Sequence, residues 1–177
     1  VLLEKHEQKI LDLPRQKKFV SPFEAKPKMP ALKGTGTGFI VSGDGHILTN
    51  NHVIDGCSSI KLITPSLDND LAVIGADKEN DLAVLKSSSN SLPMLVFSDK
   101  SVKLTEEILV AGFPFGDTFN SSIKVTKGIV SSLSGMNNNF ATFQIDAAVQ
   151  PGNSGGPVVD GKGNVVGIIV GKLNPEV

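Results

Sequence analysis

One serine of this 177-residue chain stands where it could act as a nucleophile. Ser154 lies in the run Gly152-Asn153-Ser154-Gly155-Gly156, just ahead of an apolar stretch. Small neighbours leave room for an incoming peptide backbone, and the backbone N–H groups of Gly152 and Ser154 could point into one pocket. There they would stabilise a developing oxyanion by about 3–4 kcal/mol for each donor. The run alone is equally typical of an ordinary glycine-rich loop, so its meaning depends on a base being found.

Three histidines are candidates for that base. His6 lies in a charged N-terminal stretch and is expected to point into water. His46 follows Gly43-Asp44-Gly45, a hairpin-turn signal, and is expected to begin a surface strand. His52 closes the apolar-polar run 47–54, which predicts the end of a half-buried strand, where an imidazole is fixed while one edge stays exposed. No metal site is predicted around it, and a satisfied structural histidine is the alternative until a partner acid is found.

Asp81 is the best candidate for that acid. It stands after the polar turn 77–80 and at the head of the mostly apolar run 82–86, at the boundary between core and solvent. A carboxylate there can accept a hydrogen bond from a histidine N–H, hold the correct tautomer and stabilise the imidazolium. Asp77, Glu79 and Asp99 compete for the role, but solvation in turns accounts for them more easily. The chain order His, Asp, Ser matches one of the known orders of this triad.

The motifs around these residues resemble the protease domain of HtrA/DegP-like serine peptidases of the trypsin fold. They occur in the family's order, with about its spacing, and together cover roughly residues 34–172. The matching segments are Gly34-Thr35-Gly36-Thr37-Gly38-Phe39, Ile47-Leu48-Thr49-Asn50-Asn51-His52-Val53, Asp81-Leu82-Ala83-Val84-Leu85, Gly112-Phe113-Pro114-Phe115-Gly116, Lys127-Gly128-Ile129-Val130-Ser131 and Gly152-Asn153-Ser154-Gly155-Gly156-Pro157.

The resemblance assigns each candidate a role. It implies that His52 is the general base, Asp81 the orienting acid and Ser154 the nucleophile, with the backbone of Gly152 and Ser154 forming the oxyanion hole. It also implies an all-β fold of two antiparallel six-stranded barrels with the active site in the cleft between them. No metal or cofactor is needed for this chemistry.

A coarse pass along the chain finds two groups of short strands, which divides residues 34–177 into a first barrel at 34–93 and a second at 94–177. The connection is expected at 87–93, a stretch rich in Ser, Asn and Pro. The second group offers only about five strands, so the last strand that closes the family's second barrel is expected to be missing. The predicted strands are 38–41, 46–54, 59–64, 71–76 and 81–86, then 107–112, 123–133, 141–149, 157–159 and 165–172, with turns at 135–139 and 160–164.

The first 33 residues differ in charge from the rest. They hold eight Lys/Arg and four Asp/Glu, a net charge of +4. The other residues hold nine Lys/Arg and fourteen Asp/Glu, a net charge of −5, and the two sum to the −1 of the whole chain. This segment is expected to be an N-terminal helix at 1–13 followed by an extended, proline-punctuated basic arm; a contact arm for acidic partners is the alternative. The resemblance implies a homotrimer built partly by this segment, with Phe19 or Phe23 as an apolar anchor.

The whole chain's charge argues against a general nucleic-acid binder. No signal peptide is recognised at its start, and no apolar segment is long enough to span a membrane. With one cysteine the chain has no intrachain disulfide, which is neutral between cytosol and periplasm. By resemblance the location is a bacterial periplasm or cell envelope, with a cytosolic or organellar one left open.

Specificity is expected to depend on residues beside Ser154 and on the last strand. By resemblance, the position that is acidic in trypsin-like digestive enzymes falls on Ala148, so a Lys or Arg substrate side chain would lack a buried counter-charge. Val149 and Val170 would form a small or medium apolar pocket, and Lys172 near its rim could narrow it or attract acidic groups. Val170 also replaces the Ser or Thr that supports the catalytic acid in many relatives.

Two further features receive structural interpretations. Cys57 is expected to fill a small buried apolar space, since a thiol nucleophile paired with His52 would be too close to it in sequence. The run 34–38 has the glycines of a phosphate loop but lacks the Gly-Lys-Ser/Thr that follows in one. Close packing of strands explains it better.

These observations predict a serine endopeptidase that cleaves unfolded or extended polypeptides through an acyl-enzyme, in protein quality control. The main alternative is a binding or chaperone-like module that keeps the trypsin fold in an inactive state. An esterase-like hydrolase is disfavoured, because the nucleophile-elbow pattern is missing and the chain order differs. The expected partners are polypeptide substrates.

Overall fold

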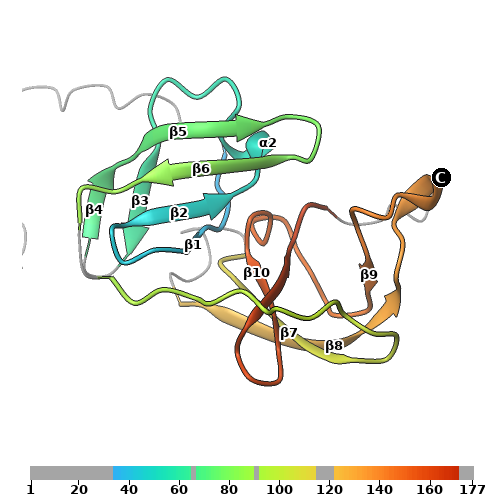
Figure 1. Cartoon of the computed structure of the whole chain (residues 1–177). Helices are drawn as coiled ribbons and strands as arrows, with labels where there is room; N and C mark the ends of the chain where they lie inside the picture. Colours follow the sequence, from blue (N-terminus) through green and yellow to red (C-terminus); the bar gives the residue numbers. More distant parts are fainter. Residues whose placement is uncertain (1–33, 65–66, 90–91, 115–121, 172–177) are drawn as a thin grey trace, which may run out of the picture. The chain divides into compact units, whose positions relative to one another are not determined.

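Alternating burial along two neighbouring strands builds the centre of the first sheet. In the computed structural model, which describes residues 34–64, 67–89, 92–114 and 122–171, this sheet has the order β1-β2-β6-β5 and is antiparallel throughout (Figure 1). Its strands are β1 (Phe39–Ile40), β2 (His46–Thr49), β5 (Ala72–Asp77) and β6 (Leu82–Lys86). Ala83 and Leu85 of β6 point to the same side and form a core with Ile47 and Ile54, as the two-residue period of a strand requires.

A short hairpin accompanies this sheet. It pairs β3 (Lys61–Thr64) with β4 (Leu67–Asp70). The second of these strands was not expected from the sequence, because Asp68, Asn69 and Asp70 have low strand propensity and give no apolar alternation. The first strand group therefore contains six strands in two sheets.

The second sheet is five-stranded and antiparallel, in the order β11-β10-β7-β8-β9. Its strands are β7 (Glu107–Gly112), β8 (Lys124–Ser132), β9 (Gln144–Ile145), β10 (Pro157–Asp160) and β11 (Val165–Ile168). Alternate residues of β7 are buried, and Ile108 and Val110 form the centre of a core with Val130 and Val158. The apolar alternation at 107–112 thus predicted this strand correctly.

The segment that follows β6 runs between the two sheets and bonds to both. The amide of Leu95 donates to the Ile40 carbonyl at 2.9 Å, and the carbonyl of Val96 accepts from the Val165 amide at 2.7 Å. The rings of Phe39 and Phe97 pack with centroids 6.4 Å apart. The connection therefore contributes to the packing between the sheets.

The chain divides into two compact units, Val1–Leu32 and Lys33–Val177, and every described residue belongs to the second. The expected helix and basic arm at 1–33 and the end of the chain at 172–177 lie outside the described residues. The all-β class and the two antiparallel strand groups are confirmed, with five strands in the described part of the second group.

Several predicted strands were too long; of 165–172, for example, only Val165–Ile168 forms strand β11. The run 46–54 is not one strand: β2 ends at Thr49, and Asn51–Ile54 forms a single helical turn, α2, with extended backbone at Asn50. Within 141–149 only β9 is a strand, because its pairing with β8 shifts register between Val130 and Ser132. The turn expected at 160–164 is present, closed by the Gly163 amide on the Asp160 carbonyl at 3.0 Å.

Candidate active site

His52 stands on helix α2, one turn beyond the end of β2. The apolar side of that turn is anchored by Ile54, which belongs to the core of the first sheet. His52 lies on the opposite, open side, and 48% of its side chain is exposed. The predicted strand end is therefore wrong in form, but the predicted environment, an anchored backbone with an exposed ring edge, is present.

Asp81 is held by four hydrogen bonds from the segment that carries His52. Its Oδ1 accepts from the backbone amide of His52 at 2.8 Å and its Oδ2 lies 2.6 Å from the ring Nδ1. Its carbonyl oxygen accepts from the amide of Asn51 at 3.2 Å and from Nδ2 of Asn50 at 2.9 Å. The backbone of Asp81 has a φ of +55°, a region in which Asp is commoner than most residues. These bonds stabilise a conformation that would otherwise be unfavourable.

The contact between Asp81 and His52 selects one form of the imidazole. An ionised carboxylate can only accept hydrogen bonds, so the proton of the neutral ring lies on Nδ1. The other ring nitrogen, Nε2, is then left with a free lone pair. The structure thus brings together two of the three residues singled out in the sequence, in the arrangement that a general base requires.

Asp77 and His46, which the sequence offered as alternatives to Asp81 and His52, form hydrogen bonds away from Ser154. The carboxylate of Asp77 accepts from the amides of Glu79 and Asn80 and from Nδ2 of Asn80, at 2.7–3.1 Å. The side-chain bond from Asn80 is the main cause that lowers the pKa of Asp77 below its ordinary value. His46 begins β2, and its Nδ1 lies 2.7 Å from the hydroxyl of Ser42. Neither residue is directed at Ser154.

Ser154 lies in a tight turn ahead of β10. The amide of Asn153 donates to the carbonyl of Gln150 at 3.0 Å, and the amide of Gly156 donates to the carbonyl of Asn153 at 2.8 Å. Gly152 has a φ of +98° and Gly155 a φ of +82°, which explains the need for glycine at both positions. The turn therefore depends on the small residues that drew attention in the sequence.

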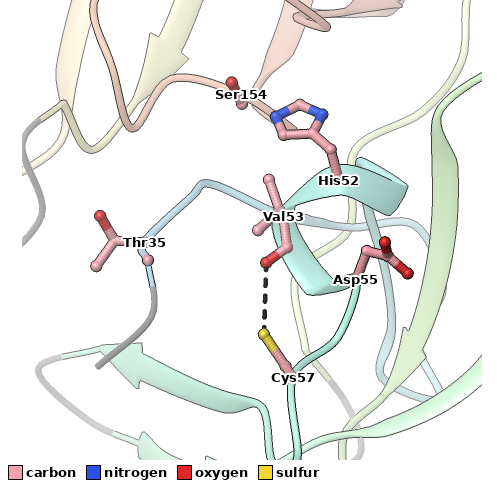
Figure 2. A pocket seen from close by; sticks show the side chains of 7 residues that line it. Thr35, His52, Val53, Asp55, Cys57 and Ser154 are labelled. Atoms are coloured by element: carbon pink, nitrogen blue, oxygen red, sulfur yellow. Dashed lines mark hydrogen bonds between the residues drawn. The ribbon is translucent and has the colours of Figure 1, made fainter. Parts of the chain in front are cut away.

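Ser154 and His52 line the same hollow, of about 250 Å³, although one belongs to the second sheet and the other to the first. Figure 2 shows the His52 ring and the Ser154 side chain on one side of it, with Thr35 and Cys57 on the others. Within the described part of the chain, the Ser154 hydroxyl forms no hydrogen bond. Its hydroxyl proton and oxygen are therefore both available to a group in this hollow.

The backbone amides of Gly152 and Ser154 also have no acceptor among the described residues. In a tight turn such unpaired donors form a natural anion site. The Ser154 amide shares a peptide plane with the Asn153 carbonyl. Because that carbonyl accepts a hydrogen bond from the Gly156 amide, the direction of the Ser154 N–H is fixed as well. The two amides are therefore available as donors to an anionic group.

A second hollow, of about 220 Å³, lies on the other side of Ser154. Val149 lines it as expected, together with Gln150, Pro151, Ile169 and Gly171. Val170 is not among its lining residues and is 36% exposed. Ile169 takes its place, because it pairs with the nucleophile turn: its amide donates to the Gly156 carbonyl at 2.9 Å and its carbonyl accepts from the Gly155 amide at 2.8 Å. Lys172 lies outside the described residues.

Cys57 is not the buried residue that the sequence led us to expect. It is partly exposed and lines the hollow beside His52, with Sγ 3.9 Å from the Val53 carbonyl. It follows directly on α2, in a surface turn closed by its own amide on the Ile54 carbonyl at 3.1 Å. A turn at the surface leaves one side of the thiol open.

Sequence reasoning missed Asn50, whose side chain is fully buried and bonds to the carbonyl of Asp81. A polar residue inside an otherwise apolar run, just ahead of a candidate histidine, is the signal that could have found it. Over the described ranges, no group of three or more His, Cys, Asp or Glu could hold a metal ion. No helix in that same part of the chain has the length and apolarity that a membrane crossing demands.

Comparisons with known proteins identify the family of the chain. Residues 36–168 match the family described as trypsin-like peptidase domain. A probable periplasmic serine endoprotease, DegP-like, from Pseudomonas savastanoi pv. phaseolicola is 47% identical over 139 residues, which are 75% of this chain and 28% of that protein. A DegP-like protein from Hahella chejuensis is 42% identical over 85% of this chain and 32% of its own length. The chain thus spans about a third or less of these relatives.

Two solved structures share the fold. The HtrA-type protease AlgW with a decapeptide superposes with a TM-score of 0.70 at 34% identity, covering 80% of this chain and 44% of that one. A serine endoprotease from Yersinia pestis gives a TM-score of 0.70 at 32% identity, with 79% and 49% covered. The two strand groups are therefore the two half-barrels of the trypsin-like fold. In agreement with the HtrA/DegP-like resemblance of its motifs, the chain belongs to the family of trypsin-like peptidase domains.

Proposed function

We propose that this chain is the peptidase domain of a serine endopeptidase, with His52, Asp81 and Ser154 as its catalytic triad. The observation that carries the proposal is the bond of 2.6 Å between Nδ1 of His52 and Oδ2 of Asp81, in a histidine that lines one hollow with Ser154. This arrangement leaves Nε2 as a base beside a free serine hydroxyl. The family membership of the chain and the names of its relatives support the same activity.

The reaction follows from the roles of these atoms. Nε2 of His52 takes the proton of the Ser154 hydroxyl while Oγ attacks a substrate carbonyl carbon, and the carbonyl oxygen becomes an oxyanion. The amides of Gly152 and Ser154 bind that oxyanion, and the carboxylate of Asp81 stabilises the imidazolium. Nε2–H then protonates the leaving amine, and the acyl-enzyme remains. Water, deprotonated by the same nitrogen, hydrolyses it.

The substrate is proposed to be an extended polypeptide. The hollow lined by Val149 and Ile169 is apolar and lacks a buried acid, so it suits a small or medium apolar side chain. The relatives are named as periplasmic endoproteases, and a structural relative was solved with a decapeptide. We therefore propose a role in protein quality control in the periplasm, and, from the HtrA/DegP-like resemblance, a homo-oligomer.

A fluorophosphonate probe tests the nucleophile directly, because it phosphonylates only a serine that has an active base and oxyanion pocket. Labelling of the wild type at neutral pH and complete loss in Ser154→Ala are expected, together with a loss of casein cleavage of about 10⁶-fold. Ser101→Ala, which changes an exposed loop serine, is the matched control and should label normally. Equal labelling of wild type and Ser154→Ala would refute the assignment.

A resting, binding-competent module is the second candidate. It is favoured by one observation: the Ser154 hydroxyl forms no hydrogen bond among the described residues, so the His52–Ser154 contact is not made at rest. In that case the wild type would bind unfolded casein without cleaving it and would stay unlabelled until a peptide effector is added. Labelling of the chain without any effector excludes this candidate.

A further inference from the structure

Thr37 connects the first strand group to the nucleophile turn, 115 residues away in sequence. It lies between Gly36 and Gly38, ahead of β1, and is only 4% exposed. Its hydroxyl donates to the carbonyl of Gly152 at 2.7 Å, and its amide donates to the carbonyl of Ser154 at 2.8 Å. One residue of the glycine-threonine run therefore bonds to both residues whose amides line the oxyanion pocket.

The Thr37 hydroxyl has no freedom to rotate away. It has one proton, which is used on Gly152, and its oxygen also accepts from the amide of Phe113 at 3.0 Å. The Thr37 carbonyl in turn accepts from the hydroxyl of Thr49 at 2.8 Å. With its hydroxyl, amide and carbonyl all bonded inside the protein, Thr37 is a rigid support for the turn.

The bonds of the turn show what this support controls. The Asn153 and Ser154 carbonyls are held by Gly156 and Thr37, and the Gly152 carbonyl by the Thr37 hydroxyl. Four successive peptide planes join Pro151 to Gly155. Only in the first plane, which contains the Pro151 carbonyl and the Gly152 amide, does the carbonyl accept no hydrogen bond from a described residue. Its direction depends on the Gly152 backbone, which is fixed on the far side by Thr37.

The turn is closely packed around Thr37. A Cβ built on Gly112 would lie 2.7 Å from Oδ1 of Asn153 and 3.1 Å from Oγ1 of Thr37, and one built on Gly156 would lie 3.4 Å from Cγ2 of Thr37. Glycines thus pack against both the hydroxyl and the methyl group of Thr37. A rotation of the peptide plane between Gly152 and Asn153 would break the bond between the Gly152 carbonyl and the Thr37 hydroxyl.

We propose that Thr37 is a positioning residue of the oxyanion pocket: its hydroxyl holds the Gly152 carbonyl and thereby keeps the Gly152 amide directed at the developing oxyanion. This inference rests on the proposed peptidase function. Thr37 does not touch the reacting atoms, so its contribution is felt in the transition state and not in the binding of the peptide.

The test compares two substitutions of similar size. Thr37→Val keeps the branched shape and loses the hydroxyl, whereas Thr37→Ser keeps the hydroxyl. With a peptide substrate, Thr37→Val should lower kcat by about 10–100-fold, below the roughly 10²–10³-fold loss of a direct oxyanion donor, with KM nearly unchanged. Thr37→Ser should restore kcat to within about threefold of the wild type. If Thr37→Val lacks a native circular dichroism spectrum, Thr37→Ala removes the same hydroxyl without adding volume.

A peptide boronic acid separates positioning from general stability, because its adduct with Ser154 places an oxygen in the oxyanion pocket. Its inhibition constant should weaken in Thr37→Val by the same factor as kcat/KM. The dissociation constant of an uncleaved peptide for Thr37→Val/Ser154→Ala should equal that for Ser154→Ala. Ser132→Ala is the control, since it removes a partly buried hydroxyl that donates to the Ser134 carbonyl and contacts neither Thr37 nor the nucleophile turn.

Each outcome decides the matter. An unchanged kcat in Thr37→Val, an equal loss in Thr37→Ser, or a loss as large in Ser132→Ala would overturn the inference. So would an equal weakening of boronate and peptide binding. If the wild type itself resists the fluorophosphonate probe, the proposed function fails instead, so the two failures are distinguishable.

Discussion

Both carboxylate oxygens of Asp81 accept a hydrogen bond from one residue, His52: Oδ1 from its backbone amide and Oδ2 from its ring. The backbone bond fixes where the carboxylate lies, and the ring bond fixes how the imidazole is turned. Position and tautomer of the base are thus set by the same side chain. Replacing one carboxylate oxygen of Asp81 is therefore expected to change the tautomer of His52.

Asp81→Asn is expected to lower kcat by about 10⁴-fold while the protein stays folded. The amide oxygen can still accept from the His52 backbone, but its NH₂ group faces Nδ1 and forces that nitrogen to be the acceptor. The proton then lies on Nε2, which can no longer act as a base. Steady-state kinetics and circular dichroism measure the two effects. Asp77→Asn is the control, and a loss of similar size there would contradict the assignment.

Gly155→Ala is expected to damage both stability and activity. Its φ of +82° is unfavourable for alanine, and the added Cβ would collide with the Thr37 carbonyl and the Thr49 hydroxyl. Such a substitution costs more than about 1 kcal/mol and lowers Tm by at least about 2–4 °C. Gly161→Ala is the matched control, since a Cβ there meets nothing within 4 Å. Thermal melts of the two variants that coincide would show the packing argument to be wrong.

Alkylation of Cys57 is expected to inhibit peptide cleavage. The thiol is partly exposed in the hollow that His52 and Ser154 also line, so a group as bulky as N-ethylmaleimide would occupy space needed by substrate. Because the chain has a single cysteine, mass spectrometry reports the modification without ambiguity. Cys57→Ser should cleave at the wild-type rate and resist the reagent. Full activity of the singly alkylated wild type would rule out this use of the hollow.

Asp160 is expected to make the stability of the second sheet depend on acid pH. Its carboxylate caps the β10–β11 turn, and the bond from the Asn164 amide is the main cause that lowers the pKa of Asp160 below its ordinary value of 3.8. A lowered pKa in the folded state means that the stabilisation is complete above the ordinary value. It is lost as the pH falls through the lower, folded-state value.

Urea denaturation of wild type and Asp160→Ala between pH 7 and pH 2.5 measures this effect. The difference in free energy of unfolding should be largest at neutral pH and should shrink at the acid end. Asp160→Asn keeps an acceptor oxygen but cannot titrate, so its difference from Asp160→Ala should stay constant. The prediction would be contradicted if the wild type exceeded Asp160→Ala in free energy of unfolding by the same amount at both ends of the pH range.

The sequence predicted the class, the strand groups and the identity of the candidate triad, because each leaves a local pattern. Alternation along 107–112 identifies β7, and glycines beside Ser154 identify a tight turn. Conformations decided by distant contacts were not predictable. The helical turn at His52 depends on bonds from residues 50–52 to Asp81, some 30 residues away.

Distant contacts also explain why the lining of the second hollow and the bonds of Thr37 could not be predicted from the sequence. Whether Val170 or Ile169 enters the hollow depends on which of them pairs with the nucleophile turn, and this pairing has no signature in the residues themselves. Thr37 appeared only as part of a glycine-rich run. Its use is visible once residues 115 positions apart are seen bonded.

The proposed base and the proposed nucleophile belong to different sheets, since His52 lies in the turn after β2 and Ser154 in the turn before β10. Neither sheet can therefore work on its own, and the reactive pair exists only while the interface between them is intact. Under gradually increasing denaturant, serine reactivity should vanish while the strand signal in circular dichroism is still native. If the proposed triad is correct, a chain built in this way would lose activity on the first loosening of its two halves, before it could attack other copies of itself that have begun to unfold.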